Sequence, residues 1–390
     1  MTGKPTAEII GAGIGGLTAA TALAQRGWQI RLHERESEIR AIGAGIYVWG
    51  NGLATLRALG LHDEAVIGAH IGPTLESRDR RGRTVERLTI NGPDQPQVKT
   101  IMRDRLIRTL VAGAVRAGVE IRTGSEIVAA DPAGAVFDSA GTRFGADLVV
   151  AADGVNSRIR DTLGVPMRRI RSTQGAIRLT VPWTQEFVAP EDRGSYLEFF
   201  SGRRRVLYTP SSAEHLYVAL VADTSDTAAT TVPIDVDSWV RSFPALETLI
   251  RSLAEVPGRW DTFEFIRLRR WSTGRVAFLG DAAHAQPPYL GQGGGCAMMN
   301  ALGLADAVSA APQAITKALG VWEATERPTI EHTQRWSYGL RLLNNLPDAA
   351  RSPLLRTVDR MPILGRSRLR AAVTIPTGCD AFAAAERTSE

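Results

Sequence analysis

The chain has 390 residues, of which 44% are hydrophobic and 22% are charged, and this length allows two packed domains with a sizeable core. No basic-then-apolar leader opens it, and no apolar run approaches the roughly 20 residues of a membrane span, so we expect a cytoplasmic protein with no membrane partner. The net charge of +5 comes from dispersed arginine runs without interleaved aromatic residues, which argues against a nucleic-acid partner.

The first predicted elements form a βαβ unit. A buried strand, AEII, leads through the tight turn GAGIGG into a helix, and the second strand, WQIRLHE, ends at Glu34. Gly11 allows the turn, Gly13 lets the backbone approach a pyrophosphate, and Gly16 lets the helix pack closely on the strand. Glu34 stands where a carboxylate accepts hydrogen bonds from an adenosine ribose. The unit predicts dinucleotide binding but does not distinguish NAD from FAD.

A second buried strand lies in ADLVVAADGVNSRIR, which spans residues 146–160. This strand runs into Asp153 and Gly154 and is followed by a helix. Asp153 could contact a cofactor or could cap that helix, and the pattern leaves both interpretations open.

The periodicity between Asp153 and Asp281 is typical of an antiparallel sheet. The segments GAIRLTVPW, SYLEFF, RRRVLYTP and HLYVALVA alternate or run apolar between short turns, and two helical segments follow. Residues 73–97 are expected to add strands to this sheet. Arg178 and Arg205 lie on its apolar strands, and a buried guanidinium needs a carboxylate or phenolate partner. Arg178 could instead point outward at a sheet edge.

The segment VAFLGDAAHAQPPYLGQGGGCAMMNA, from Val276 to Ala301, is the most unusual part of the chain. It is expected to end an apolar strand on Asp281. An unpaired charge in that position costs several kcal/mol, since even an uncharged polar group costs about 2–7 kcal/mol to bury without a partner. A bound partner is therefore predicted at this aspartate. The later part, CAMMNALGLADAV, predicts a helix. Cys296 and Cys379 have no CxxC spacing and the histidines never fall at i, i+4, so we predict no metal site.

The three motifs, in this order and at these separations, resemble those of the flavoprotein aromatic hydroxylases, the single-component FAD monooxygenases. The resemblance covers about residues 6–340. It implies an α/β fold with a Rossmann-like FAD-binding domain, an antiparallel-sheet substrate domain and a helical C-terminus. The implied boundaries are 1–72, 98–167 and 270–345 for the FAD-binding domain, 73–97 and 168–269 for the substrate domain, and 346–390 for a helical or irregular tail.

The resemblance also implies a set of cofactor-binding residues. Arg103 would open a helix beside the ribityl and phosphate groups of FAD, and Asp281 would bind the ribityl hydroxyls. The glycines after Asp281 would leave room for the flat flavin ring, with the helix N-terminus at its pyrimidine edge. The full predicted set is Gly11, Gly13, Gly16, Glu34, Arg35, Arg103, Asp153, Asp281, Gly291, Gly293, Gly294 and Gly295.

Within the family the chain is most similar to the oxygenases that hydroxylate and open a pyridine ring. The similar segments are AIGAGIYVWGNGLATLRALG, GAIRLTVP, RRVLYTPSSAEHLYVAL and LGQGGGCAMMNALGL. This similarity places Arg205 and Tyr217 in the substrate pocket and Pro288 beside the flavin, and all three are the predicted catalytic residues. Leu75 stands where those enzymes have a tyrosine. Arg178 completes the predicted substrate-binding set, for a ring that bears an acid group.

The function implied is hydroxylation of an electron-rich aromatic or N-heteroaromatic ring, with or without ring opening. NADH or NADPH would bind transiently, because no second GxGxxG is present, and would reduce noncovalent FAD, which forms a C4a-hydroperoxide with O2. Tyr217 would keep the ring's hydroxyl hydrogen-bonded. A monomer or homodimer is expected. A flavin-dependent halogenase lacks support because no WxWxIP segment occurs, and a non-oxygenating FAD-dependent reductase is left open.

Overall fold

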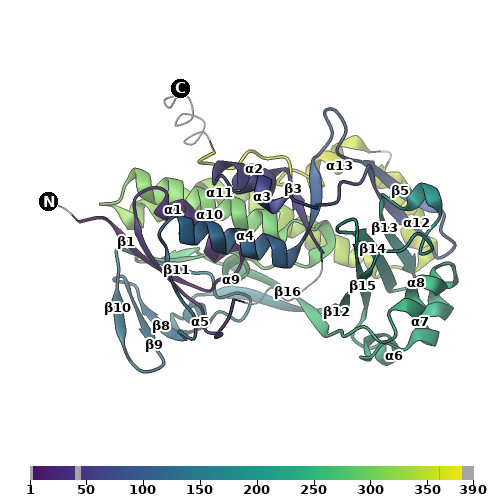
Figure 1. Ribbon diagram of the computed structural model, residues 1–390, viewed down its shortest axis with the longest axis horizontal. Helices are drawn as coiled ribbons and strands as arrows, with labels where there is room; N and C mark the ends of the chain where they lie inside the picture. Colours follow the sequence, from purple (N-terminus) through teal and green to yellow (C-terminus); the bar gives the residue numbers. More distant parts are fainter. Residues whose placement is uncertain (1–2, 40–44, 360, 380–390) are drawn as a thin grey trace.

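The computed structural model describes residues 3–39, 45–359 and 361–379 of the chain, with two main sheets lying in opposite halves of the molecule (Figure 1). The first four residues of the motif AIGAGIYVWG, 41–44, lie outside the described residues. None of the helices within the described ranges is long and apolar enough to cross a membrane.

The first sheet has six strands in the order β17-β18-β11-β1-β2-β7. All neighbours pair in parallel except β17, which is antiparallel to β18. The predicted strands AEII, WQIRLHE and ADLVV are confirmed. The bounds are β1 Thr6–Ile10, β2 Gln29–His33, β7 Glu120–Arg122, β11 Leu148–Ala151, β17 Ser272–Thr273 and β18 Val276–Phe278.

Helices α1 (Ile14–Ala24), α4 (Arg103–Arg116) and α10 (Gly293–Ala310) pack beside this sheet, with α1 in contact with the other two. Almost all of α1 is buried, because its alanines and leucines cover both the sheet and α10. The smaller elements of this half are β3 Gly45–Trp49, α2 Gly50–Ala58, α3 His62–Ala65, β6 Val98–Met102, β8 Ile127–Asp131, β9 Ala135–Asp138, β10 Arg143–Gly145, α5 Arg158–Thr162 and α9 Asp281–His284.

The second sheet has seven strands in the order β16-β12-β15-β14-β13-β4-β5, and every neighbouring pair is antiparallel except β13 and β4. The expected contribution of residues 73–97 is confirmed by β4 and β5. The long strands β12 and β16 reach from this sheet toward the first one (Figure 1). The bounds are β4 Thr74–Arg78, β5 Thr84–Thr89, β12 Met167–Pro182, β13 Tyr196–Ser201, β14 Arg204–Pro210, β15 His215–Asp223 and β16 Trp260–Leu268.

The two faces of the second sheet have different surroundings, because successive side chains of a strand point to opposite faces. On the outer face, Val206, Tyr208 and Val218 pack against Trp239 in a hydrophobic core. That face is covered by α6 (Thr227–Thr230), α7 (Val236–Ser242) and α8 (Glu247–Ser252). The other face, which we call the inner face, carries Arg178, Glu198, Arg205, Leu207, Tyr217 and Ala219 in the observed register.

The C-terminal region is helical, as expected from the sequence. It consists of α11 (Ile315–Asn344), α12 (Asp348–Asp359) and α13 (Pro362–Arg368), and α12 contacts β5 (Figure 1). Arg351 of α12 is 1% exposed and donates a 2.7 Å hydrogen bond to the carbonyl of Gly202, in the turn between β13 and β14. The C-terminal helices are therefore anchored on the second sheet.

Candidate active site

The glycine turn after β1 has the conformation that its sequence predicts. Gly11 has φ +99°, and a Cβ there would lie 2.5 Å from the carbonyl oxygen of Ala152. A Cβ on Gly16 would lie 2.0 Å from the carbonyl oxygen of Gly11, so both positions require glycine for close packing. A Cβ on Gly13 meets nothing within 4 Å. Gly13 therefore leaves open space at the N-terminus of α1, where a phosphate group fits.

Glu34 lies beside this turn at the end of β2. Its Oε2 accepts a 2.9 Å hydrogen bond from the N–H of Ala12, and its Oε1 accepts one of 3.1 Å from the N–H of Glu36. These bonds fix the carboxylate at the edge of the open space above α1. Arg35 is exposed and forms an ion pair with Glu36 at 3.3 Å, and its contact with a cofactor stays a prediction.

Asp153 follows β11 and is only partly satisfied by the chain. Its Oδ2 accepts a 3.3 Å hydrogen bond from the N–H of Ile159, while Ser157 is the N-cap of α5 and accepts a bond from the N–H of Arg160. Burial raises the pKa of Asp153. Its Oδ1 is buried and finds no donor within the described ranges. An unpaired buried oxygen is costly, so a donor on a bound ligand suits this position.

Asp281 lies at the start of α9 rather than at the end of a strand. The expectation that the strand ends on this residue is wrong, because β18 ends at Phe278, and Gly280, with φ +62°, turns the chain before Asp281. This turn leaves the Asp281 carboxylate exposed. The charge is therefore set at a surface where a ligand can reach it.

Arg103 lies near Asp281 and begins α4, as predicted. Burial lowers the pKa of Arg103, the charge of Asp281 raises it, and the charge of Arg178 lowers it. The side chain is nevertheless accessible to solvent. A small molecule could therefore reach Arg103 from solvent.

The predicted glycine loop is partly helical, because α10 begins at Gly293. A Cβ on Gly294 would lie 3.0 Å from Cδ1 of Ile46, and one on Gly295 would lie 2.5 Å from Oδ1 of Asn51. These two glycines allow α10 to pack against β3 and α2, and this packing alone requires them. A Cβ on Gly293 meets nothing within 4 Å, so the packing of the protein does not by itself require glycine at this position.

Pro288 and Gly291 lie in the segment just before α10. Pro288 is exposed and begins a short 3-10 helix, Pro288–Leu290, and Gly291 follows with φ +61°. A Cβ on Gly291 would lie 3.1 Å from the ring of Tyr47. Gly291 is thus needed both for its backbone conformation and for the approach of Tyr47.

Tyr217 and Arg178 lie together on the inner face. Arg178 pairs with Ala219 of β15, just past the last pair of β12 with β16, and its side chain is 36% exposed and donates a 3.4 Å hydrogen bond to Asp261. Burial raises the pKa of Tyr217, whereas the charge and hydrogen bond of Arg178 and the charge of Arg103 lower it. The structure thus brings Arg103, Asp281, Arg178 and Tyr217, which come from both halves of the chain, into one group.

Arg205 is on the inner face but has a partner within the chain. Its Nη1 donates a 2.5 Å hydrogen bond to Oε1 of Glu198 on β13. The guanidinium also lies 4.8 Å from the ring centroid of Tyr289. The carboxylate that a buried arginine needs is therefore present in the protein, and a contact with a substrate's acid group stays a prediction.

Two further residues at the inner face were missed in the sequence. Tyr47 of β3 packs against that face and donates or accepts a 3.0 Å hydrogen bond with Thr209, and burial raises its pKa well above its usual value. Its ring packs edge-on against Tyr196, and Leu75 belongs to the same apolar cluster. Glu198 is the second residue. The alternation in SYLEFF placed Glu198 on one face of a strand, but only the sheet register shows that this is the face of Arg205.

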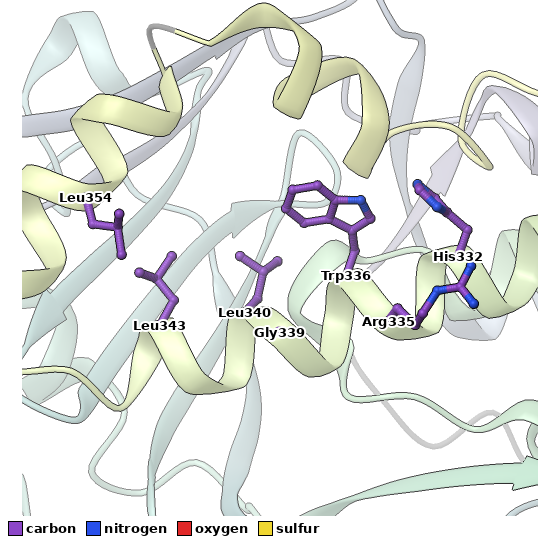
Figure 2. A pocket seen from close by; sticks show the side chains of 7 residues that line it. All are labelled: His332, Arg335, Trp336, Gly339, Leu340, Leu343 and Leu354. Carbon is purple, nitrogen blue, oxygen red and sulfur yellow. The ribbon is translucent and has the colours of Figure 1, made fainter.

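A separate cavity of about 380 Å³ lies between α11 and α12 (Figure 2). Trp336, Leu340, Leu343 and Leu354 give it apolar walls, and His332 and Arg335 lie at one end. None of the predicted site residues lines this cavity. It is therefore distinct from the group around Arg103 and Tyr217.

Comparisons with known proteins show the family of this chain. Residues 4–336 match the family described as FAD binding domain. The chain is 50% identical over 372 residues, 95% of its length and 97% of the relative's, to a probable 2-heptyl-3-hydroxy-4(1H)-quinolone synthase of Rhodococcus erythropolis. It is also 50% identical over 368 residues, 94% of its length and 96% of the relative's, to a 2-heptyl-3-hydroxy-4(1H)-quinolone synthase of Mycobacteroides abscessus.

The similar solved structures include a tetrameric form of 2-methyl-3-hydroxypyridine-5-carboxylic acid oxygenase. The TM-score is 0.85 at 38% identity, and the match covers 95% of this chain and 96% of that one. A Klebsiella pneumoniae protein complexed with FAD and uric acid gives a TM-score of 0.80 at 25% identity, over 98% of both chains. The α/β fold and the FAD cofactor expected from the sequence are confirmed, and the chain belongs to the FAD-dependent aromatic monooxygenases.

Proposed function

We propose that this enzyme uses NADH or NADPH and O2 to add one oxygen atom to C3 of a 2-alkyl-4(1H)-quinolone. The product would be the corresponding 3-hydroxy compound, the class that the names of the quinolone synthases describe. The observation that carries this proposal is the Arg205–Glu198 ion pair, because it removes the need for an acid group on the substrate. A 2-alkylquinolone has no such group, whereas a hydroxypyridine carboxylate has one.

The residues around the glycine turn fit FAD. Gly13 provides space for its pyrophosphate, Glu34 borders the same space, and the unpaired oxygen of Asp153 offers an acceptor. Asp281 and Arg103 would hold the ribityl and phosphate groups, whose hydroxyls and negative charge match these side chains. When bound and reduced, FAD supplies the activation of O2 that the protein's own side chains lack.

Tyr217 and Arg178 would orient the ring. Arg178 donates a 3.4 Å hydrogen bond to Asp261, and its positive charge acts on the Tyr217 phenol. The hydroxyl of Tyr217 would donate its hydrogen to an acceptor on the ring. The C4 oxygen of a quinolone is such an acceptor. Because burial raises the pKa of Tyr217, the phenol keeps the proton that it donates.

The alkyl chain has apolar surface available on the same face. Ala176, Ala219, Val221 and Phe263 form a cluster there, with Leu207, Tyr217 and Tyr289 packed against it. Burying alkyl groups against such side chains contributes about 0.8 kcal/mol for each methylene. Leu75, in place of a tyrosine, makes the neighbouring wall less polar as well.

The test is a comparison of ring compounds as stimulators of NADH and NADPH oxidation by the purified protein. We expect 2-heptyl-4(1H)-quinolone to stimulate oxidation coupled to O2 uptake, and we expect its 2-methyl analogue to have a KM about 100-fold or more higher. Stimulation only by 2-methyl-3-hydroxypyridine-5-carboxylate would contradict the proposal. Cofactor oxidation without O2 uptake would show a reductase instead.

A further inference from the structure

We propose that Glu198 is a specificity-determining residue, which blocks acidic rings by occupying the anion site that Arg205 would otherwise offer them. This inference rests on the proposed function, since it explains how a pocket with an arginine on its wall accepts a neutral quinolone. It assigns a role to a residue that is neither a cofactor contact nor a group that reacts.

The first argument is the position of Glu198 relative to Arg205. Glu198 pairs with Leu207, and Arg205 pairs with Phe200. Glu198 and Arg205 are therefore diagonal neighbours on adjacent strands, on the same face of the sheet. The Arg205 side chain is only 4% exposed, whereas the Glu198 side chain is 21% exposed. Glu198 is therefore the more exposed partner of the pair, and its carboxylate already accepts from the Arg205 Nη1 that an incoming carboxylate would need.

The second argument is that the side chains around Arg205 leave no other place for an acid group to bind. Tyr289 covers the guanidinium of Arg205 with its ring and gives its hydroxyl to Gln174 at 2.5 Å. Arg205 is thus covered on its ring-facing side and neutralised by Glu198. An acid group entering here would meet a carboxylate that is already present, and like charges at close range repel.

The third argument concerns the C-terminal helices, whose arginines are also engaged. Arg351 bonds to Asp348 and to main-chain carbonyls, and Arg368 pairs with Glu86 at 2.5 Å. Both arginines lie close enough to affect Glu198 electrostatically. Burial raises the pKa of Glu198, and the charges of Arg205, Arg351 and Arg368 oppose this rise. Because Arg351 and Arg368 are both paired, neither takes the place of Arg205 as an anion site.

The experiment measures binding of one acidic and one neutral ring to the FAD-loaded enzyme, followed by the change in flavin absorbance. The acidic probe is 4-hydroxyquinoline-2-carboxylate and the neutral probe is 2-heptyl-4(1H)-quinolone. Glu198→Gln removes the charge but keeps the size of the side chain. We expect it to tighten binding of the acidic probe by about tenfold or more, the scale of a hydrogen bond to a charged group. Binding of the neutral probe should change by less than about threefold.

The matched control is Asp226→Asn. Asp226 pairs with Arg204 at 2.7 Å, and Arg204 is adjacent to Arg205 but contacts Trp239 in the outer-face core. This control should leave both affinities at the wild-type value. The double variant Glu198→Gln with Arg205→Met should lose the gain, because the freed arginine is then absent. If Glu198→Gln holds less flavin than wild type, Glu198→Ala provides the same comparison.

Unchanged binding of the acidic probe in Glu198→Gln would overturn the inference, as would an equal change for both probes. Failure of the proposed function is distinguishable, because it would appear as a wild-type enzyme that neither binds nor oxidises the neutral quinolone. Even then, the affinity of Glu198→Gln for the acidic probe can be compared with that of the wild type.

Discussion

At the scale of single residues, the site is organised by charges that come from both halves of the chain. Arg103 and Asp281 begin two different helices, and each charge affects the other. Arg178 and Tyr217 add a second polar pair from the sheet. The flavin and the ring are thereby given separate polar contacts, so substitutions should separate cofactor binding from substrate chemistry.

Asp281→Ala tests the cofactor side of this separation. We expect the purified variant to lose most of its FAD, because a hydrogen bond to a charged group contributes about 1.5–3 kcal/mol. Flavin content per protein, measured by absorbance, gives the result. Asp306→Ala, on the far part of α10 and 37% exposed, serves as the control. Wild-type affinity for FAD in Asp281→Ala would remove this aspartate from the site.

Tyr217→Phe tests the substrate side. The variant should hold FAD normally but lose about 10- to 100-fold in kcat/KM, with more peroxide released, because the ring is no longer held by the hydroxyl. Tyr208→Phe is the control, since that hydroxyl accepts a bond from Trp183 in the outer-face core. Equal kinetics for Tyr217→Phe and wild type would show that this hydroxyl has no part in the reaction.

The same residue sets an expected pH dependence. Burial raises the pKa of Tyr217 above that of an ordinary tyrosine, so its phenol should keep its proton through neutral and mildly alkaline pH and lose it only at strongly alkaline pH. Any fall in kcat that depends on Tyr217 should therefore appear only at that alkaline end. A fall near neutral pH that Tyr217→Phe abolishes would contradict this assignment.

At the scale of elements, the sequence predicted what depends on local pattern. The βαβ unit follows from apolar periodicity and from glycines whose added Cβ would clash, at Gly11 and Gly16. The strands of the second sheet follow from alternation. The start of α10 and the turn at Gly280 could not be predicted, because they depend on how α10 packs against β3 and α2, elements distant in the chain.

The partner of Arg205 was also beyond the reach of sequence. A buried arginine was expected to need a carboxylate, but Glu198 is seven positions away on another strand, and only the sheet register brings them together. In the same way, the proximity of Arg103 to Tyr217 depends on how the start of α4 lies relative to β15. Local pattern supplied the predicted site residues, whereas their contacts with one another required the tertiary fold.

Gly293→Val tests whether the first turn of α10 faces the flavin. An added side chain has space in the protein alone, so loss of FAD reduction and hydroxylation would come from a clash with the cofactor, which costs about 1–3 kcal/mol. Gly320→Val is the matched control, because it too is a helical glycine with nothing within 4 Å of a Cβ. Similar coupled turnover in both variants would place Gly293 away from the flavin.

At the scale of the whole molecule, the predicted cofactor residues and the predicted substrate residues belong to different parts of the fold. Tyr47 of β3 contacts Thr209 on one side and lies next to Gly291 on the other. The candidate site needs both parts in place, since Tyr217 lies on the second sheet and Arg103 begins α4. The division into the two predicted domains, and the monomeric or homodimeric state, stay predictions.

The central claim is that this combined site transfers a single oxygen atom from O2 to a neutral quinolone ring. The most direct measurement is the mass of the product formed from 2-heptyl-4(1H)-quinolone under O2 made of a heavy oxygen isotope. We expect a product heavier than the substrate by one labelled oxygen atom, with the ring intact. A product that contains two labelled atoms and an opened ring, or a substrate left unchanged while NAD(P)H is oxidised, would contradict the claim.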